Sequence, residues 1–244
     1  MNRTPIVTRA QLIEARDVAK SFGQTPALRG ASVTVGSGEI LAVMGPSGSG
    51  KSTLLHCLAG IFVPDRGEVW FDGQRLNTLG EAGCTRLRRT AFGFVFQFGQ
   101  LVPELTAADN VALPLLLNRV RRRAAYKTAG TWLDRLGIGG KGTNRTGELS
   151  GGEAQRVAVA RALALAPKVI FADEPTGSLD SLTGTKVMDL LTGLAREAGT
   201  TVVLVTHDAG VAAYADRVVL VRDGLVSGDL GAVGEQVSSA KAVS

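Results

Sequence analysis

Residues 45–52 read Gly-Pro-Ser-Gly-Ser-Gly-Lys-Ser, and this stretch decides the fold. It matches G-x-x-x-x-G-K-[ST] and lies between a short apolar run and a helical segment, where such a loop belongs. Glycines let consecutive backbone N–H groups curl around a phosphate, and the helix start adds its free N–H groups and positive dipole end. A Gly/Ser-rich turn with a chance lysine is the alternative, and it leaves this context unexplained. The residues expected to bind nucleotide here are Gly45, Pro46, Ser47, Gly48, Ser49, Gly50, Lys51, Ser52 and Thr53.

Two side chains of the loop have distinct expected tasks. Lys51 supplies a charge for the β- and γ-phosphates, and the Ser52 hydroxyl is suited to bind the Mg²⁺ that bridges them. The sequence therefore predicts a nucleoside triphosphate with Mg²⁺ as the ligand of this loop.

Short apolar runs elsewhere in the chain predict the sheet around this loop. Runs of this length suggest strands that are buried on both faces, as in a parallel sheet. They cover residues 40–44, 169–172, 201–206 and 218–221. Helical stretches alternate with them, at 52–59 and before Gly199, which is a suitable residue to end a helix. The alternation predicts an α/β fold with a mainly parallel sheet.

We expect a single domain over residues 1–244, built from several parts. Residues 1–97 and 167–228 form the core with the phosphate loop, and shorter alternating runs at 12–35 and 68–72 predict a small antiparallel sheet in it. Residues 98–166 form an inserted helical subdomain, because no convincing strand occurs from about 105 to 166. Residues 1–12 are expected to be a poorly ordered lead-in, and 229–244 a flexible tail.

Composition limits where the protein works. Of the 244 residues, 45% are hydrophobic, yet no apolar run approaches the roughly 18 residues that a membrane span needs. The start of the chain has no apolar signal region. We therefore expect a cytoplasmic protein, peripheral on the inner face of the membrane, whose partner supplies any membrane part. Cys57 and Cys84 are expected to be reduced structural thiols.

The net charge is +5, and the densest basic run is Arg119 to Arg123. We interpret this run as a solvated helix face, and contact with lipid or a partner is the alternative.

An acid pair and a histidine end two of the expected strands. Asp173 is placed to hold Mg²⁺ through water, and Glu174 to polarise the attacking water as general base. A solvated pair that caps a helix is the alternative for these two acids. His207 ends another strand, and ligands bind at the carboxyl ends of parallel strands. Lys51, Glu174 and His207 should therefore meet at one edge, whereas His56 is interpreted as a packing residue.

Leu149-Ser150-Gly151-Gly152-Glu153 narrows the class of protein. Ser150 and Glu153 fit a capping box at a helix start. Gly151 and Gly152 let a ligand approach the free N–H groups, so the chain has a second anion-binding helix end. One nucleotide does not need both ends from one chain. A symmetric head-to-tail dimer explains both anion-binding ends. Each of its two nucleotides would lie between the phosphate loop of one chain and this helix of the other.

From about Ile13 to Asp223 the chain resembles the ATP-binding subunits of ABC transporters. Phe22, in Lys20-Ser21-Phe22-Gly23, is similar to their adenine-stacking residue, which is more often Tyr. The resemblance implies that Gln97 senses Mg²⁺ and couples to a membrane permease, which also contacts the helical subdomain. It implies that His207 contacts the γ-phosphate. It further implies that Ser150, Gly151, Gly152, Glu153 and Asp180 reach the ATP of the partner chain; Asp180 also fits as a helix cap.

The stretches 93–97 and 101–106 resemble most the lipoprotein-release and macrolide-export group (LolD/MacB type), with the cell-division ATPase FtsE nearby. An ATPase subunit for efflux or mechanical transmission is therefore expected, and an FtsE-like regulator of division or the cell wall is the alternative. An ATP-binding clamp without turnover is opposed by the intact Glu174 and His207. A soluble ABC ATPase acting on nucleic acid is opposed by the lack of a heptad run between Lys51 and Ser150, so no nucleic acid partner is expected.

Overall fold

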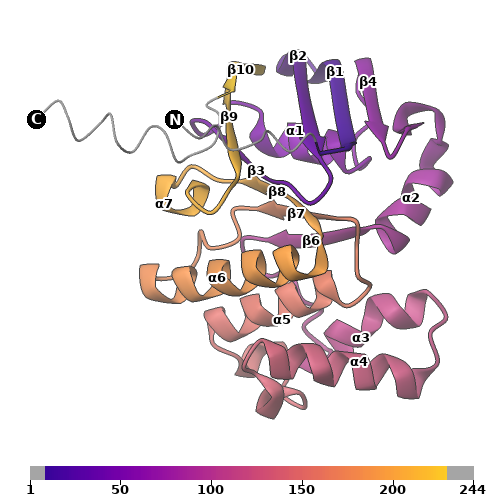
Figure 1. Cartoon of the computed structure of the whole chain (residues 1–244), viewed down its shortest axis with the longest axis vertical. Helices are drawn as coiled ribbons and strands as arrows, with labels where there is room; N and C mark the ends of the chain where they lie inside the picture. The colour runs from indigo at the N-terminus through magenta and orange to yellow at the C-terminus, as the bar shows by residue number, and fades with distance from the viewer. Residues whose placement is uncertain (1–8, 230–244) are drawn as a thin grey trace, which may run out of the picture.

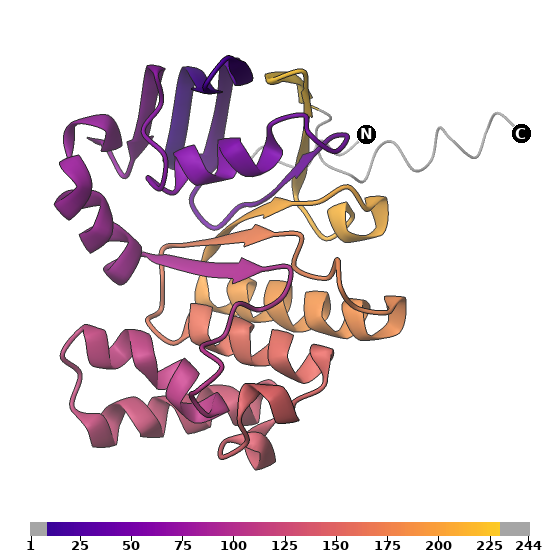
Figure 2. The same cartoon turned by 180° about the vertical axis from the view of Figure 1, so that it is seen from behind.

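The computed structural model describes residues 9–229, which form two β-sheets and three layers of helices (Figures 1 and 2). The strands are β1 (Gln11–Phe22), β2 (Thr25–Gly36), β3 (Ile40–Met44), β4 (Arg66–Phe71), β5 (Gln74–Arg75), β6 (Phe92–Phe96), β7 (Val169–Asp173), β8 (Thr201–Val205), β9 (Arg217–Arg222) and β10 (Leu225–Asp229). The helices are α1 (Lys51–Leu58), α2 (Gly80–Thr90), α3 (Ala107–Leu117), α4 (Arg122–Arg135), α5 (Gly151–Leu163), α6 (Ser181–Ala198) and α7 (Ala209–Ala212), with 3-10 turns at Leu76–Thr78, Gly139–Lys141 and Thr146–Glu148.

The larger sheet has the strand order β10-β9-β3-β8-β7-β6, and β10 is its only antiparallel member within the described residues. Side chains alternate between its two faces, as strand geometry requires. On β7, Ile170 and Ala172 enter one core, while Val169 and Phe171 enter the other. Burial on both faces explains why these strands read as continuous apolar runs, and the predicted α/β fold is confirmed.

One face of this sheet packs against α1 and the smaller antiparallel sheet, whose order is β2-β1-β4-β5. The other face packs against α5 and α6, and behind these lie α3 and α4 (Figure 1). From 105 to 166, a section the structure describes throughout, the regular elements are helical, and a single isolated bridge joins Thr106 to Arg145.

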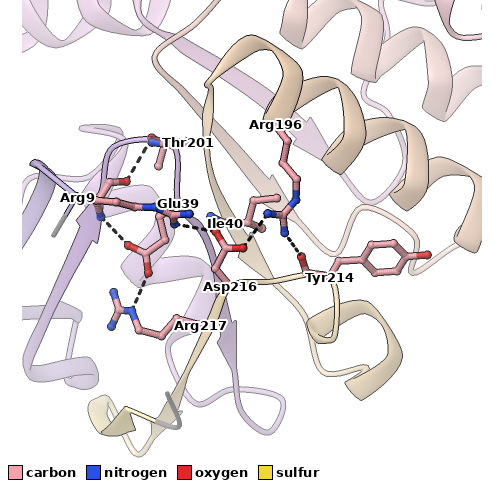
Figure 3. Close-up of polar contacts among 10 residues, drawn as sticks. Arg9, Glu39, Ile40, Arg196, Thr201, Tyr214, Asp216 and Arg217 are labelled. Carbon is pink, nitrogen blue, oxygen red and sulfur yellow. Dashed lines mark hydrogen bonds and ion pairs between the residues drawn. The ribbon is translucent and has the colours of Figure 1, made fainter. Parts of the chain in front are cut away.

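A polar network holds the first described residues against the core (Figure 3). Asp216 accepts hydrogen bonds from Arg9 Nη1 at 2.8 Å, from the Ile40 amide at 3.1 Å and from Arg196 Nη1 at 2.9 Å. Next to it, Glu39 accepts from Arg217 Nε at 2.7 Å and from the Gly36 amide at 2.6 Å. These contacts join the small sheet, the start of β3, α6 and β9 at the edge opposite the phosphate loop.

Several boundaries differ from the sequence predictions. Gln11 and Leu12 belong to β1 rather than to a poorly ordered lead-in, because Gln11 pairs with Gly36 at the end of β2 and the Leu12 carbonyl accepts from the Asp72 amide at 2.8 Å. Asp229 belongs to β10, where its backbone pairs with Val219. Strand β6 and helix α2 were not expected. The predicted disorder of residues 1–8 and 230–244 lies outside the described residues. Cys57 and Cys84 are free and buried, and burial raises the pKa of the Cys57 thiol to about 12.

Candidate functional site

The phosphate loop connects β3 to α1, and two of its glycines are required by space as well as by backbone conformation. Gly45 has φ +151°, and a Cβ there would lie 2.1 Å from the Val221 carbonyl oxygen. Gly50 has φ +103°, and its Cβ would lie 2.4 Å from the Ala27 carbonyl oxygen. The loop is therefore pressed against β9 and β2, which fixes the direction of its N–H groups.

Lys51 and Ser52 lie at the start of α1 and face the end of β7. Lys51 Nζ donates to the Pro46 carbonyl at 2.8 Å, across the loop. Ser52 Oγ donates to Asp173 Oδ1 at 3.1 Å. Burial raises the pKa of Asp173, against the hydrogen bond from Ser52, which lowers it. The arrangement holds a carboxylate and a hydroxyl next to each other at the mouth of the loop.

Glu174 and His207 lie side by side at the ends of β7 and β8. His207 Nδ1 lies 2.7 Å from Glu174 Oε1, and Thr206 Oγ1 donates to Glu174 Oε2 at 3.4 Å. Glu174 has φ +47°, a conformation that costs a non-glycine residue about 1 kcal/mol or more and that gathers at functional sites. Its amide donates to the Val205 carbonyl at 2.9 Å, so the neighbouring strand holds this strained backbone in place.

A cleft of about 380 Å³ brings together most of the residues predicted to contact the nucleotide held by their own chain. It is lined by Ala27, Ser47, Gly48, Gly50, Lys51, Ser52, Thr53, Gln97, Glu174 and His207. Ala27, on β2, was not predicted, and no local pattern singles it out. Gly45, Pro46, Ser49 and Asp173 belong to the loop and the strand end behind this lining, and Phe22 does not line the cleft.

Phe22 ends β1 with 49% of its surface exposed. Its ring lies edge-on to Phe62, with centroids 5.3 Å apart, and Lys20 Nζ lies 6.0 Å from the ring centroid. Phe62 in turn packs on His56 at 5.1 Å, which agrees with the packing role expected for His56. Phe22 therefore presents an accessible aromatic face beside α1.

The backbone after β6 is tied to α5 and to the segment before α6. Gln155 Nε2 donates to the Phe96 carbonyl at 2.9 Å, and Arg161 donates to the carbonyls of Gly99 and Gln100 at 2.8 Å each. Ser178 Oγ donates to the Gln97 carbonyl at 2.7 Å. These tethers were missed from sequence. Gln155 offered a signal, because it is a polar residue on the buried face of α5.

The second predicted helix end lies outside the cleft of its own chain. Ser150 and Glu153 form the expected capping box at the start of α5, with Ser150 N donating to Glu153 Oε2 at 2.8 Å. A Cβ on Gly152 would lie 2.3 Å from Thr183 Cγ2, so α5 and α6 approach closely there. Asp180 caps α6, accepting from the Thr183 amide at 3.0 Å.

The side-chain oxygen atoms at the cleft are suitable ligands for Mg²⁺. This hard cation is commonly held by one or two carboxylates together with substrate phosphates. Ser52 and Asp173 already lie in contact, and the Gln97 side chain lines the same cleft. Across residues 9–229 there is no group of three or more His, Cys, Asp or Glu side chains that would hold a metal unaided. The residues present therefore fit an ion that arrives with a nucleotide.

Comparison with known proteins supports the binding of a nucleotide by this chain. A family model described as "ABC transporter" matches residues 28–177. The lipoprotein-releasing system ATP-binding protein LolD of Geobacter metallireducens is 44% identical over 224 residues, covering 90% of this chain and 100% of that protein. The macrolide export ATP-binding/permease protein MacB of Marinobacter nauticus is 43% identical over 225 residues, covering 91% of this chain and 35% of that longer protein.

A solved structure is similar over nearly the same range. The dimeric post-hydrolysis state of the ATP-binding cassette MJ0796, bound to ADP and Pi, is 40% identical with a TM-score of 0.82, covering 90% of this chain and 98% of its own. Within the described part of this chain, no helix is long and apolar enough to cross a bilayer.

Proposed function

The chain belongs to the ABC transporter family as an ATP-hydrolysing subunit, and we propose that it works in a complex of the lipoprotein-release or macrolide-export type. It hydrolyses ATP in the cleft that joins the phosphate loop, Gln97, Glu174 and His207, and this convergence is the observation that carries the proposal. Phe22 stacks on the adenine at the open side of the loop.

Each residue of the cleft has a task in this proposal. The loop amides and Lys51 hold the β- and γ-phosphates, and Lys51 exchanges the Pro46 carbonyl for phosphate oxygens. Ser52, Asp173 and Gln97 would hold Mg²⁺, which would supply positive charge to neutralise the phosphates. Glu174 accepts a proton from the attacking water, and His207 turns from Glu174 Oε1 to the γ-phosphate. Thr206 keeps the second carboxylate oxygen of Glu174 oriented.

Two chains enclose two ATP molecules. Ser150, Gly151, Gly152, Glu153 and Asp180 then contact the nucleotide held by the partner chain. The position of these residues outside their own cleft supports this arrangement, and so does the dimeric form of the similar cassette MJ0796. The two glycines at the start of α5 leave its first N–H groups open to a phosphate.

The permease docks in a mainly apolar groove of about 400 Å³ between α2, β6, α3 and α5. It is lined by Thr85, Arg88, Arg89, Phe92, Gly93, Phe94, Pro114, Leu117, Arg161, Ala162 and Leu165. Arg161 links this groove to the cleft, because its guanidinium holds the backbone just after Gln97. In this arrangement the chain lies on the cytoplasmic face of the membrane.

Replacement of the general base tests the proposal. Glu174→Gln keeps a hydrogen-bonding group beside His207 but removes the base, so ATP hydrolysis should fall about 10²- to 10⁴-fold while ATP still binds. The variant should accumulate as a dimer with ATP, measured by light scattering on a sizing column. Lys51→Ala is the control and should lose tight ATP binding. Parental hydrolysis by Glu174→Ala would contradict the assignment of the base.

A further inference from the structure

The positive charge of this chain is concentrated in one segment. Residues 85–130 contain eight Lys or Arg and only two Asp or Glu, Glu104 and Asp109. This segment has a net charge of +6, so the rest of the chain carries −1 when the whole carries +5. The basic character of the protein therefore belongs to α2 and the connection of α3 to α4, not to the surface at large.

The fold brings these cations to one side of the molecule. Asn118 Nδ2, at the end of α3, donates to the Arg89 carbonyl near the end of α2 at 2.8 Å. The α2 and α3–α4 segments lie on the same side in both views (Figures 1 and 2). We call this set the basic edge; its exposed members are Arg86, Arg89, Arg119, Arg121, Arg122, Arg123 and Lys127.

The basic edge is not neutralised by acidic residues of the described chain. None of its seven members forms an ion pair with a described residue. Glu81 is engaged by Arg88. Asp109 accepts from Thr106 and Tyr126, and its carboxylate also interacts through its charge with Arg122. Some exposed arginines elsewhere, such as Arg16 and Arg135, do have carboxylate partners. Apart from Arg122, whose charge is partly offset by Asp109, the charges of the edge are therefore available to a partner.

The start of α4 places positive charge where a helix disfavours it. Arg121 is the N-cap, Arg122 and Arg123 follow in the first turn, and no acidic residue is present there. The positive end of the helix dipole disfavours cations and attracts anions. An anionic partner would be attracted by the helix end and by the arginines together. The arrangement therefore favours a negatively charged surface beside this turn.

We propose that the basic edge binds the anionic phospholipid headgroups of the membrane that holds the permease. This inference rests on the proposed permease groove, which shares Arg89 with the edge and is also lined by Leu117, two positions before Arg119. A permease seated there brings the bilayer surface toward the same side of the chain. Leu117, with 59% of its surface exposed, adds an apolar contact beside the charges.

Nucleic acid, the other common polyanion, fits the edge less well. Single-stranded nucleic acid is held by aromatic rings that stack on bases as well as by charge. The Tyr126 ring, beside the start of α4, is only partly exposed, and Arg122 lies over it with its guanidinium 5.3 Å from the centroid. An extended anionic surface needs no such rings, and each Lys or Arg near it adds about fivefold to affinity.

Vesicle flotation with the full chain tests the inference. The protein should bind vesicles of phosphatidylcholine with phosphatidylglycerol at low salt and release them at high salt. It should not bind vesicles of phosphatidylcholine alone. The variant Arg86→Gln/Arg121→Gln/Arg123→Gln should bind about 100-fold more weakly. The matched control Arg66→Gln/Lys186→Gln/Arg222→Gln loses the same charge from exposed, unpaired cations of the described chain elsewhere and should bind within about threefold of the parent.

Three results would overturn the inference. These are no binding of the parent to anionic vesicles at low salt, equal loss in both triple variants, and tighter edge-dependent binding to a short RNA than to anionic vesicles. Basal ATP hydrolysis without lipid should be unchanged in both triple variants. Loss of lipid binding with intact hydrolysis therefore concerns the edge alone, whereas failure of the Glu174→Gln experiment concerns the proposed function.

Discussion

Asp173, proposed above to hold Mg²⁺, has a cost to the stability of the fold. Burial raises the pKa of its carboxyl, so the folded chain holds this proton to higher pH than an ordinary aspartate does. The folded state then binds more protons than the unfolded state, and stability falls as pH rises from the ordinary value through the raised one. At neutral pH the ionised side chain destabilises the fold unless a cation binds beside it.

The variant Asp173→Asn should therefore make the nucleotide-free protein more stable at neutral pH, because the amide keeps an acceptor for Ser52 without the buried charge. Mg²⁺-dependent ATP hydrolysis should fall about 10- to 100-fold, as for other groups that orient a metal indirectly. Urea denaturation and phosphate release measure the two effects.

The gain in stability should disappear below the ordinary pKa of aspartate, where both proteins are neutral at this site. Glu104→Gln, an exposed change, is the control and should alter the free energy of unfolding by less than about 0.5 kcal/mol. A less stable Asp173→Asn protein at neutral pH would refute this account of burial.

Helices α5 and α6 meet where their first turns carry the residues proposed for the partner nucleotide. Gly152 lies against Thr183, and Gly151 lies against Leu179, where a Cβ would be 3.3 Å from Cδ2. The two helix starts therefore behave as one rigid unit, and a change of volume between them should move both.

Gly152→Ala should destabilise the protein by about 1–3 kcal/mol, because the new methyl group would lie 2.3 Å from Thr183 Cγ2. Thermal denaturation measures the loss. Adding Thr183→Ser removes that methyl group and should restore much of the stability. Gly193→Ala, in the middle of α6 with nothing within 4 Å, is the control and should stabilise by about 0.5–1 kcal/mol. An unstable Gly193→Ala protein, or no rescue by Thr183→Ser, would contradict the steric explanation.

Elements with a local signal could be predicted from the sequence, and those without one could not. The apolar runs around Ile40, Val169 and Thr201 gave β3, β7 and β8, and Ser150 with Glu153 gave the start of α5. Helix α2 was missed because it is mostly polar and buries little of its surface. Strand β6 was not predicted, because residues 93–97 were interpreted only as part of a motif. Phe92 to Phe96 is nevertheless an apolar run, and in the fold it pairs with the buried strand β7.

The same division holds for the site. The phosphate loop, the acid pair and His207 were predicted because parallel strands deliver their carboxyl ends to one edge. The contacts of Thr206, Gln155 and Arg161 were not predicted, because each joins residues that are more than 30 positions apart. Only packing of the whole chain brings these partners together.

At the scale of the whole molecule, Asp216 joins residues that lie far apart in the sequence, namely Arg9, Ile40 and Arg196. Burial tends to raise the pKa of Asp216, but Arg9, the Ile40 amide and Arg196 outweigh burial and lower it. A carboxyl whose pKa is lowered by folding stabilises the fold at pH values above its ordinary pKa. This stability is lost as the pH falls through the pKa of the folded state. The network in Figure 3 therefore contributes most at neutral pH.

Asp216→Asn should lower the free energy of unfolding at neutral pH by about 1 kcal/mol, because charge-assisted hydrogen bonds to two partly exposed arginines are lost. The difference between variant and parent should shrink as pH falls below the ordinary aspartate value, as followed by chemical denaturation across that range. ATP hydrolysis at saturating ATP should change little, since the network lies at the edge opposite the phosphate loop. If the difference in the free energy of unfolding did not depend on pH, the charge of Asp216 would not be the source of its stabilising effect.

The segregation of charge also acts before any contact is made. With +6 between residues 85 and 130 and −1 over the rest of the sequence, the positive charge of the chain is concentrated in the segment that holds α2 and the start of α4. Near an anionic surface such a molecule is turned as well as drawn in, so it arrives with one side already facing the target. Productive encounters with a membrane complex then become more frequent at low ionic strength, and orientation during diffusion, rather than the strength of the final contacts, sets how quickly the complex assembles.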